Sequence, residues 1–333
     1  MANRVWILMG VGLFCTSACQ RSDAYRKDQD YYKSESPSYY NKTGAPGAGL
    51  APGTPGSKTP SQRIEAMGQP KKRIMILDFW NDTPVRQQEV GLFAADELRR
   101  GLSLSQRVIL PLDAKTDRVT EDFVNGDHVK VAQLIREGRR LGVAVLVIGR
   151  VSRVVYRIRG DDIGLLRQKQ SIAAADVEMK VFDVNSGKEI MASGKSGESS
   201  SSAMVAIEPE NLESAEFRSE MTRLAVRNAV AQLVPDVVRA VEKMTWEGHV
   251  AKIVGKKIYL NAGRTSGIAA GDILKVMTQG EDVIDPATGA FLGRAPGQLK
   301  GTVEVVEFIG ADGAVAEVHT GGNIREGDTV QLY

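Results

Sequence analysis

The sequence predicts two folded domains: an α/β (α+β) domain with a mixed sheet and flanking helices, followed by a small all-β barrel or sandwich. Three observations lead to this prediction. Apolar runs that could be buried on both faces alternate with helical periodicities in the first half of the chain. Short alternating strands separated by glycine-rich turns take over after residue 245. The length of 333 residues favours about two domains.

The N-terminus is predicted to deliver and anchor the chain. Arg4 precedes an apolar stretch, residues 5–14, that is well short of the roughly 20 residues needed to span a bilayer. Residues 16–19, TSAC, resemble a bacterial lipobox, so we predict a lipoprotein signal peptide over residues 1–18 and lipidation of Cys19. The alternative is an ordinary secretory signal with two incidental cysteines. Gln20 stands where the sorting pattern wants Asp for inner-membrane retention, which favours the periplasmic face of the outer membrane.

Residues 19–72 are predicted to be a disordered tether. Pro, Gly, Ser and Lys dominate this segment, and it offers almost no aliphatic side chains to bury, so the entropy lost on ordering could not be recovered. Two tyrosine pairs, at 31–32 and 39–40, could stack on a partner or on glycans, although such tyrosines are more often simply solvated.

The α/β domain is predicted to begin with a central strand at Arg73–Asn81, whose consecutive apolar residues suit burial on both faces. A helix follows over residues 85–106, then a short strand over 107–112. Asp127 is a candidate N-cap for the next helix, which Gly142 ends. Residues 143–148 form another doubly buried strand, and we expect Leu77 and Val145 to share one core.

An antiparallel extension and a long helix complete this domain. Alternation over residues 149–159 and 172–184 predicts strands with one solvated face, and residues 185–187 form a turn into a return strand. A helical stretch covers residues 213–244, and Pro235 is expected to kink or split it.

The order of these elements resembles the CsgG family. The most specific pieces are the strand end at Phe79, Asn81 and Asp82, the glycines at 142 and 149 around a buried strand, and the hairpin FDVNSGKEI at 182–190. Relatives include the N-terminal domain of TolB, the middle domain of FlgT and the peptidoglycan-synthase activator LpoB. The resemblance implies a CsgG-like domain over residues 73–245 that acts by assembling and not by catalysis.

Residues 246–333 form the second predicted domain and resemble the C-terminal domain of FlgT, including the segment DPATGAFLG at 285–293. One short motif is repeated within this domain: the pairs Gly271-Asp272 and Gly327-Asp328 each precede a strand. Glycine accommodates positive φ at such a turn and aspartate bonds the turn backbone, so we expect structural aspartates here in preference to metal ligands.

Several kinds of chemistry are set aside. His128, His249 and His319 are dispersed without a cysteine pair, which argues against zinc. The stretch 194–196, GKS, imitates a phosphate loop but has Glu189 where the motif needs glycine. The net charge of +2 comes from interleaved charges, which argues against nucleic acid. We therefore expect no enzyme, no catalytic residue, no cofactor and no metal.

The sequence predicts a lipid-anchored envelope lipoprotein that works as a homo-oligomeric assembly scaffold of a flagellar or curli-type secretion machine. The expected partners are the membrane, through the N-terminal lipid, further copies of the chain, and envelope or flagellar assembly proteins. One alternative is an LpoB-like activator that engages a penicillin-binding protein. A secretion pore of the CsgG type ranks below both, because residues 165–174 and 195–202 lack the apolar outward face of a membrane strand.

Overall fold

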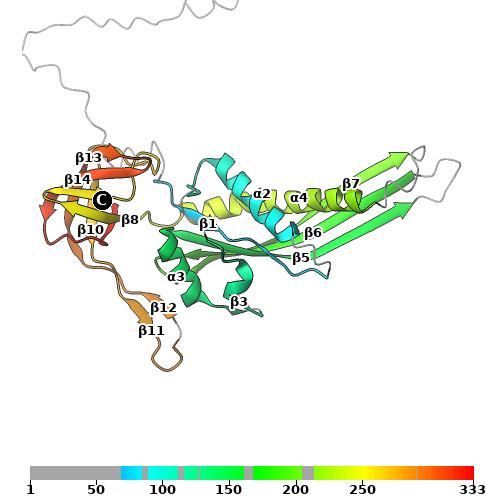
Figure 1. The fold of residues 1–333 in the computed structure, drawn as a ribbon, viewed down its shortest axis with the longest axis horizontal. Helices are drawn as coiled ribbons and strands as arrows, with labels where there is room; N and C mark the ends of the chain where they lie inside the picture. The colour runs from blue at the N-terminus through cyan, green and yellow to red at the C-terminus, as the bar shows by residue number, and fades with distance from the viewer. Residues whose placement is uncertain are drawn as a thin grey trace, which may run out of the picture. The chain divides into compact units, whose positions relative to one another are not determined.

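The computed structural model describes residues 69–84, 89–111, 116–126, 128–160, 168–204, 214–289 and 291–333. Strands dominate these residues, and three α-helices accompany them (Figure 1). The chain forms a mixed α/β part up to residue 242 and a strand-only part from residue 248. No helix within the described ranges is long and apolar enough to cross a membrane.

A mixed five-stranded sheet organises the first part. β1 (Ile74–Ile76) and β2 (Trp80–Asn81) both pair in parallel with β5 (Val145–Gly160). β5 pairs antiparallel with β6 (Gln168–Asp183), which pairs antiparallel with β7 (Glu189–Met204), giving the order β1-β5-β6-β7. The predicted mixed sheet is confirmed.

The predicted opening strand is divided into β1 and β2. Phe79 turns inward between them and packs on Gly149 of β5, where an added Cβ would lie 2.5 Å from the Phe79 ring. A glycine at 149 is therefore needed for this close approach. The strand predicted at 107–112 is reduced to a single parallel bridge between Arg73 and Ile109.

β5 changes its inward face part-way along its length. Val145, Val147 and Val151 lie in the same core as α2 and α4, but beyond a register shift between Val151 and Arg153 it is Val154 and Tyr156 that pack there. A bulge places two residues opposite one and so reverses the alternation. The two predicted segments, 143–148 and 149–159, are thus one strand of 16 residues.

Helices cover both faces of the sheet. α2 (Glu89–Ser105) and α4 (Ala215–Glu242) pack on one face, where Ala173, Val177 and Val181 of β6 are buried. α3 (Val131–Leu141), the 3-10 turn Thr120–Phe123 and the short hairpin of β3 (Val124–Asn125) and β4 (His128–Val129) cover the other (Figure 1).

Two predictions about the α3 side are corrected. The sequence predicts that Leu77 and Val145 share one core, but they lie on opposite faces of the sheet. Leu77 packs with Leu146 in the core under α3, whereas Val145 packs in the core under α2 and α4. Val145 and Leu146 are neighbours in one strand and therefore point to opposite faces. The predicted cap, Asp127, lies outside the described residues, but the N-cap of α3 is Lys130, since residues 128–129 pair as β4 first. Gly142 ends α3 as predicted, with a left-handed φ of 65°.

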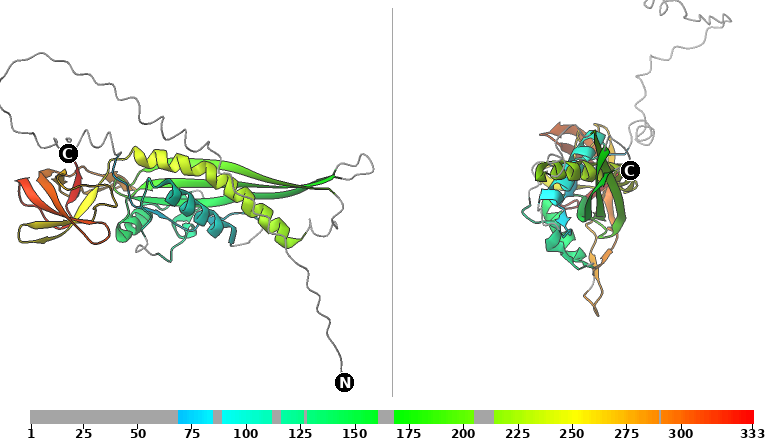
Figure 2. Two further views of the ribbon diagram at one scale, coloured as in Figure 1. Left: turned by 90° about the horizontal axis from the view of Figure 1, so that it is seen from above. Right: turned by 90° about the vertical axis from the view of Figure 1, so that its right-hand side faces the viewer.

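α4 passes through Pro235 as one helix, so the predicted split does not occur. Ser214 caps its N-terminus by accepting a hydrogen bond from the Phe217 amide at 3.1 Å. Leu233 and Val237, on either side of the proline, are fully buried, and this packing against the sheet offsets the missing backbone donor. Figure 2 shows α4 running obliquely along the three long strands.

The C-terminal part is a closed barrel, which decides between the predicted barrel and sandwich. Its hydrogen-bonded order is β10-β13-β14-β9-β8-β15. The strands are β8 (Gly248–Val254), β9 (Lys257–Leu260), β10 (Ile273–Met277), β13 (Leu299–Ile309), β14 (Gly313–Gly321) and β15 (Thr329–Leu332). Trp246, Leu274, Val303 and Val330 are among the side chains that fill it.

The two Gly-Asp turns are equivalent in structure as well as in sequence. Gly271 and Gly327 have φ values of 85° and 88°. The carboxylate of Asp272 accepts a hydrogen bond from the Ala269 amide at 2.7 Å, and that of Asp328 accepts one from the Arg325 amide at 2.7 Å. The predicted structural role of both aspartates is confirmed.

Candidate functional site

The predicted lipidation residue, Cys19, lies outside the described residues, as do both tyrosine pairs of the tether. The three histidines are separate: His128 lies on β4, His249 on β8 and His319 on β14. Residues 194–196 lie in the middle of β7, where Lys195 Nζ contacts Asp236 at 3.4 Å. The part of the chain that the structure describes holds no group of three or more His, Cys, Asp or Glu side chains arranged for a metal ion.

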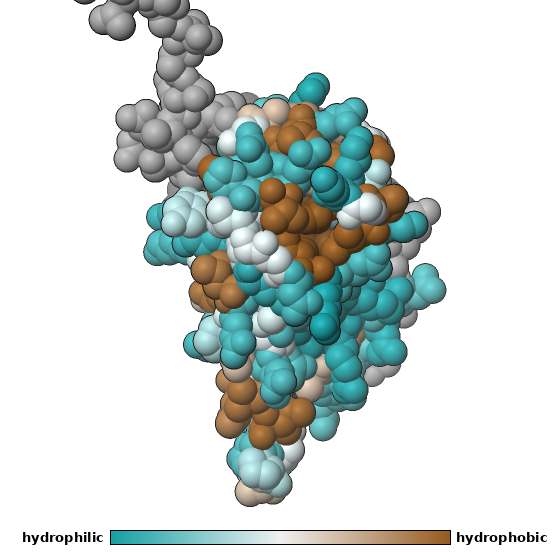
Figure 3. Space-filling model, turned by 90° about the vertical axis from the view of Figure 1, so that its left-hand side faces the viewer, coloured by the Kyte–Doolittle hydropathy of each residue, from teal (hydrophilic) through white to brown (hydrophobic). Residues whose placement is uncertain are grey.

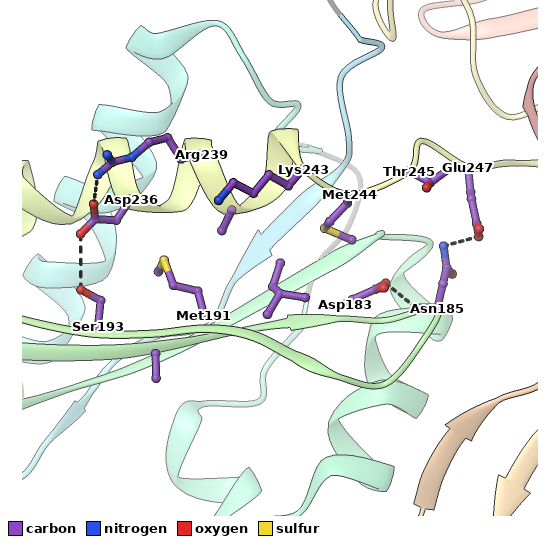
Figure 4. Close-up of a pocket in the computed structure, with 13 residues that line it drawn as sticks. Asp183, Asn185, Met191, Ser193, Asp236, Arg239, Lys243, Met244, Thr245 and Glu247 are labelled. Carbon is purple, nitrogen blue, oxygen red and sulfur yellow. Dashed lines mark hydrogen bonds and ion pairs between the residues drawn. The ribbon is translucent and has the colours of Figure 1, made fainter.

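A cleft of about 740 Å³ lies between the C-terminal half of α4 and the start of β7 (Figure 4). Asp236 is its most highly bonded acid, with Ser193 Oγ and Lys195 Nζ each 3.4 Å away and Arg239 donating from one turn further along α4. The bond from Arg239 above all, together with Lys195, holds the pKa of Asp236 below its ordinary value. Asp236 is therefore a bound carboxylate that links helix to strand.

Glu247 closes the other end of this cleft. Asn185 Nδ2 donates to one of its oxygens at 2.6 Å and Gln331 Nε2 donates to the other at 2.7 Å. Burial raises the pKa of Glu247, and the bond from Gln331 partly opposes this shift. Both oxygens are occupied by neutral amides from the sheet hairpin and from β15. The arrangement joins the α/β part to the barrel and does not present a general base to the cleft.

A hairpin outside the barrel makes a second connection. β11 (Asp282–Ile284) pairs with β12 (Phe291–Arg294). The Arg139 guanidinium of α3 holds Asp282 through two hydrogen bonds of 2.8 Å. Phe291 packs so closely on Gly187 that an added Cβ there would lie 1.9 Å from its ring. One side of the hairpin is thus docked on the turn that the sequence predicts at residues 185–187.

The other side of the hairpin and the barrel surface carry exposed apolar side chains. Of the twelve large apolar residues exposed among the described positions, nine lie in this C-terminal part. Figure 3 shows hydrophobic areas on the barrel and on the hairpin, with hydrophilic side chains between them. We call this set the apolar surface: Val254, Val283, Ile284, Leu292, Leu299, Val306, Ile309, Val318 and Tyr333. Sequence periodicity did not single these residues out, because alternation alone does not tell which face of a small barrel strand points inward.

No family model matches the chain. No curated protein matches it either. Part of the chain is similar to solved structures. One is the hypothetical protein CT253 from Chlamydia trachomatis, at 14% identity over 51% of this chain and 98% of that one, with a TM-score of 0.33.

Two further similar structures come from other bacteria. Lipoprotein GNA1162 from Neisseria meningitidis is 14% identical over 50% of this chain and 99% of that one, with a TM-score of 0.26. The LpoB C-terminal domain from Salmonella enterica is 13% identical over 41% of this chain and 90% of that one, with a TM-score of 0.25. At these scores the likenesses do not assign a function to the chain.

Proposed function

We propose that this chain is a non-catalytic lipoprotein, anchored at the periplasmic face of the outer membrane, that works as a homo-oligomeric assembly scaffold. The observation that carries the proposal is the apolar surface on the barrel and the β11–β12 hairpin. Exposed apolar side chains that are concentrated in one part of a soluble protein mark candidate sites of association. The machine served would be of the flagellar or curli-secretion kind, on the strength of the CsgG-like and FlgT-like sequence patterns.

The hairpin is the part of the apolar surface best suited to a contact between copies. Asp282 and Phe291 fix it to the α/β part, so its position is set before any partner binds. Ile284 and Leu292 stay 57% and 61% exposed. Because each side chain is already partly covered, burying the remainder in a partner would contribute roughly 1 to 2 kcal/mol each. A fixed apolar element also saves the ordering cost that a loose loop would add.

The proposal can be tested by crosslinking through single thiols. The chain has two cysteines, both in the first 19 residues, so Leu292→Cys introduces a thiol that can be addressed specifically in the lipidated protein. We expect a bis-maleimide to join copies through Leu292→Cys in cells. Leu104→Cys on α2 is the matched control, since Leu104 is 74% exposed but lies apart from the apolar surface. Equal crosslinking at the two positions, or none at either, would contradict the proposed interface.

The LpoB-like activator is the second candidate, and it predicts a different partner. Such a protein would engage a penicillin-binding protein as a single copy, and the long predicted tether favours it by giving reach. A pull-down from crosslinked envelopes separates the candidates, because a scaffold would retain flagellar or secretion proteins and an activator would retain the synthase. A pore ranks last because the exposed face of the long strands carries Arg157, Glu198 and Ser200.

A further inference from the structure

The three long strands carry a groove on the face opposite α4. Beyond the bulge, Val154 and Tyr156 pack toward α4, so Arg153, Arg157 and Arg159 point to the other face and are exposed. These arginines line a groove of about 220 Å³ together with Val155 of the same strand. Its remaining lining comes from Ile172 and Ala174 on β6 and Glu198 on β7.

The register of the sheet sets the two sides of this groove. Arg157 lies opposite Ile172, which lies opposite Ser200, and Val155 lies opposite Ala174, which lies opposite Glu198. At Arg157 and Val155 the row across the sheet thus places apolar Ile172 and Ala174 on β6, and Ser200 and Glu198 on β7. Neighbouring strands are about 4.8 Å apart, so the arginine side and the Glu198 side are separated by roughly 10 Å.

The charge of Arg153 is already satisfied within the sheet. Its Nε lies 2.6 Å from Asp176, and Ser196 Oγ donates to the other oxygen of that carboxylate at 2.6 Å. The bond with Asp176 raises the pKa of Arg153, and the bonds from Arg153 and Ser196 lower that of Asp176. Arg157 and Arg159 differ, since neither has a carboxylate partner among the residues that the structure describes. Within the described residues, two guanidinium groups without a carboxylate partner thus extend from the same face of β5, and their Cα positions are about 7 Å apart along the strand.

We propose that this groove binds an acidic glycan, a linear carbohydrate that carries carboxylates. Guanidinium groups bind carboxylates through two parallel hydrogen bonds, which suits Arg157 and Arg159. The apolar floor of Val155, Ile172 and Ala174 offers contact to the apolar face of a sugar ring. Glu198 and Ser200 accept hydrogen bonds from sugar hydroxyl groups on the far side.

The two-sided pattern distinguishes this ligand from an anionic lipid surface. A membrane plane would meet Glu198 as well as the arginines, and it could not reach the apolar floor between them. A free phosphate ion would use the arginines alone and would gain nothing from the floor. The proposal goes beyond the scaffold function, because it uses the sheet and not the apolar surface, so either can fail while the other holds.

The test uses the full chain carrying Cys19→Ser, which leaves the folded residues unchanged and removes the lipid. Isothermal titration with an octamer of galacturonic acid should show saturable binding that weakens with added salt. The same octamer with its carboxylates methyl-esterified should bind at least tenfold more weakly. Arg157→Gln with Arg159→Gln should weaken binding of the acid octamer at least tenfold. Arg136→Gln is the matched control, since Arg136 is exposed on α3 and bonds only its own helix carbonyl in the described structure.

Each other outcome overturns the proposal. Absence of octamer binding at millimolar concentration would show that the groove does not bind this glycan. Equal affinity for the acid and the ester would show that the carboxylates do not contribute to binding. Unchanged affinity of the double variant for the octamer would show that Arg157 and Arg159 do not contribute to binding. Inorganic phosphate that binds as tightly as the octamer, or flotation with phosphatidylglycerol vesicles without octamer binding, would assign the groove to phosphate or to lipid. Circular dichroism of the variants should match the parent chain, because both substituted side chains are exposed.

Discussion

Arg139 and Asp282 form a two-point ion pair in which Nη1 lies 2.8 Å from Oδ2 and Nη2 lies 2.8 Å from Oδ1. The two residues are 143 positions apart in the sequence, and the pair joins α3 to the hairpin that leaves the barrel. Arg294 donates to the same carboxylate at 3.3 Å. The side chains are 26% and 35% exposed, so solvent screens this pair only in part. It is a specific contact between the α/β part and the C-terminal part.

A double-mutant cycle on this pair should measure a coupling of about 1 kcal/mol, because a bidentate pair of partial exposure exceeds an ordinary surface pair. The cycle comprises Arg139→Gln, Asp282→Asn and both together, followed by urea unfolding. Arg136→Gln, one turn earlier on α3, controls for the loss of a helix arginine. A coupling under about 0.3 kcal/mol would show that the two parts do not depend on this contact.

The same pair should make stability depend on acidity. The hydrogen bond from Arg139 is the largest cause of the lowered pKa of Asp282. A carboxyl group whose folded pKa is depressed stabilises the protein above its unfolded pKa of about 3.9 and loses that contribution as pH falls through the lower folded value. The coupling measured at pH 7 should therefore shrink as the pH is lowered below 4. A coupling that stays constant over this range would contradict the assignment.

The core beneath α3 gives a third prediction. Leu77 is 1% exposed and packs with Phe123, Leu134 and Leu146. Leu77→Ala should lower the free energy of unfolding by about 2 to 5 kcal/mol through lost burial and a residual cavity. Leu104→Ala is the control, since Leu104 is 74% exposed and should change stability by less than about 0.5 kcal/mol. A loss under half a kcal/mol for Leu77→Ala would mean that this side of the sheet is not tightly packed.

Periodicity predicted the sheet and its helices where one face of an element is buried throughout. The buried series from Ala173 to Val181 follows strict alternation on β6, and the sequence identifies it residue by residue. β5 is different because the bulge at residues 151–153 reverses its alternation within one strand. When the inward-facing residues switch from odd to even positions within one strand, the sequence alone predicts two strands.

The candidate surfaces could not be predicted in the same way. Ile284 and Leu292 are apolar and would be assigned to a core, but their hairpin leaves the barrel and its inner side is taken by the contact with Gly187. The sequence shows Arg157 and Arg159 two positions apart. Their proximity to Ile172 and Glu198 depends on the strand register, which long-range pairing sets. Both surfaces arise from tertiary placement.

A buried lysine gives a fourth prediction. Lys72 is 4% exposed, and burial lowers its pKa from 10.5 to about 8, a shift that the carboxylate of Glu242 partly opposes. Between pH 8 and about 10.5 the unfolded chain binds more protons at this side chain than the folded chain does, so stability should rise with pH. The shift corresponds to about 3 kcal/mol in total.

The measurement compares the parent chain with Lys72→Met, which keeps the volume but cannot ionise. We expect the variant to be the more stable at pH 7, and this advantage should decrease by up to about 3 kcal/mol as the pH approaches 10.5. Lys71→Met, one residue earlier and less buried, controls for general effects of alkaline pH. A pH-independent difference between the parent and Lys72→Met would show that Lys72 is hydrated or paired in the folded state.

The lipid predicted at Cys19 should govern both the location and the association of the chain. Cys19→Ser should abolish incorporation of labelled palmitate, and undiminished labelling would rule out this anchor.

Tethering confines the copies to one surface and raises their effective concentration, so contacts too weak to hold at micromolar concentration in solution become populated. We therefore expect in-cell crosslinking to give multimers of the anchored chain and mainly monomers of Cys19→Ser, as resolved by native mass analysis. Leu292→Ser with Ile284→Ser should reduce the multimers of the anchored chain without changing palmitate labelling, because both side chains are exposed on the hairpin and lie outside the cores. If the anchored parent chain gave only monomers, the scaffold function would be contradicted. The result would favour an activator that engages its target as a single copy.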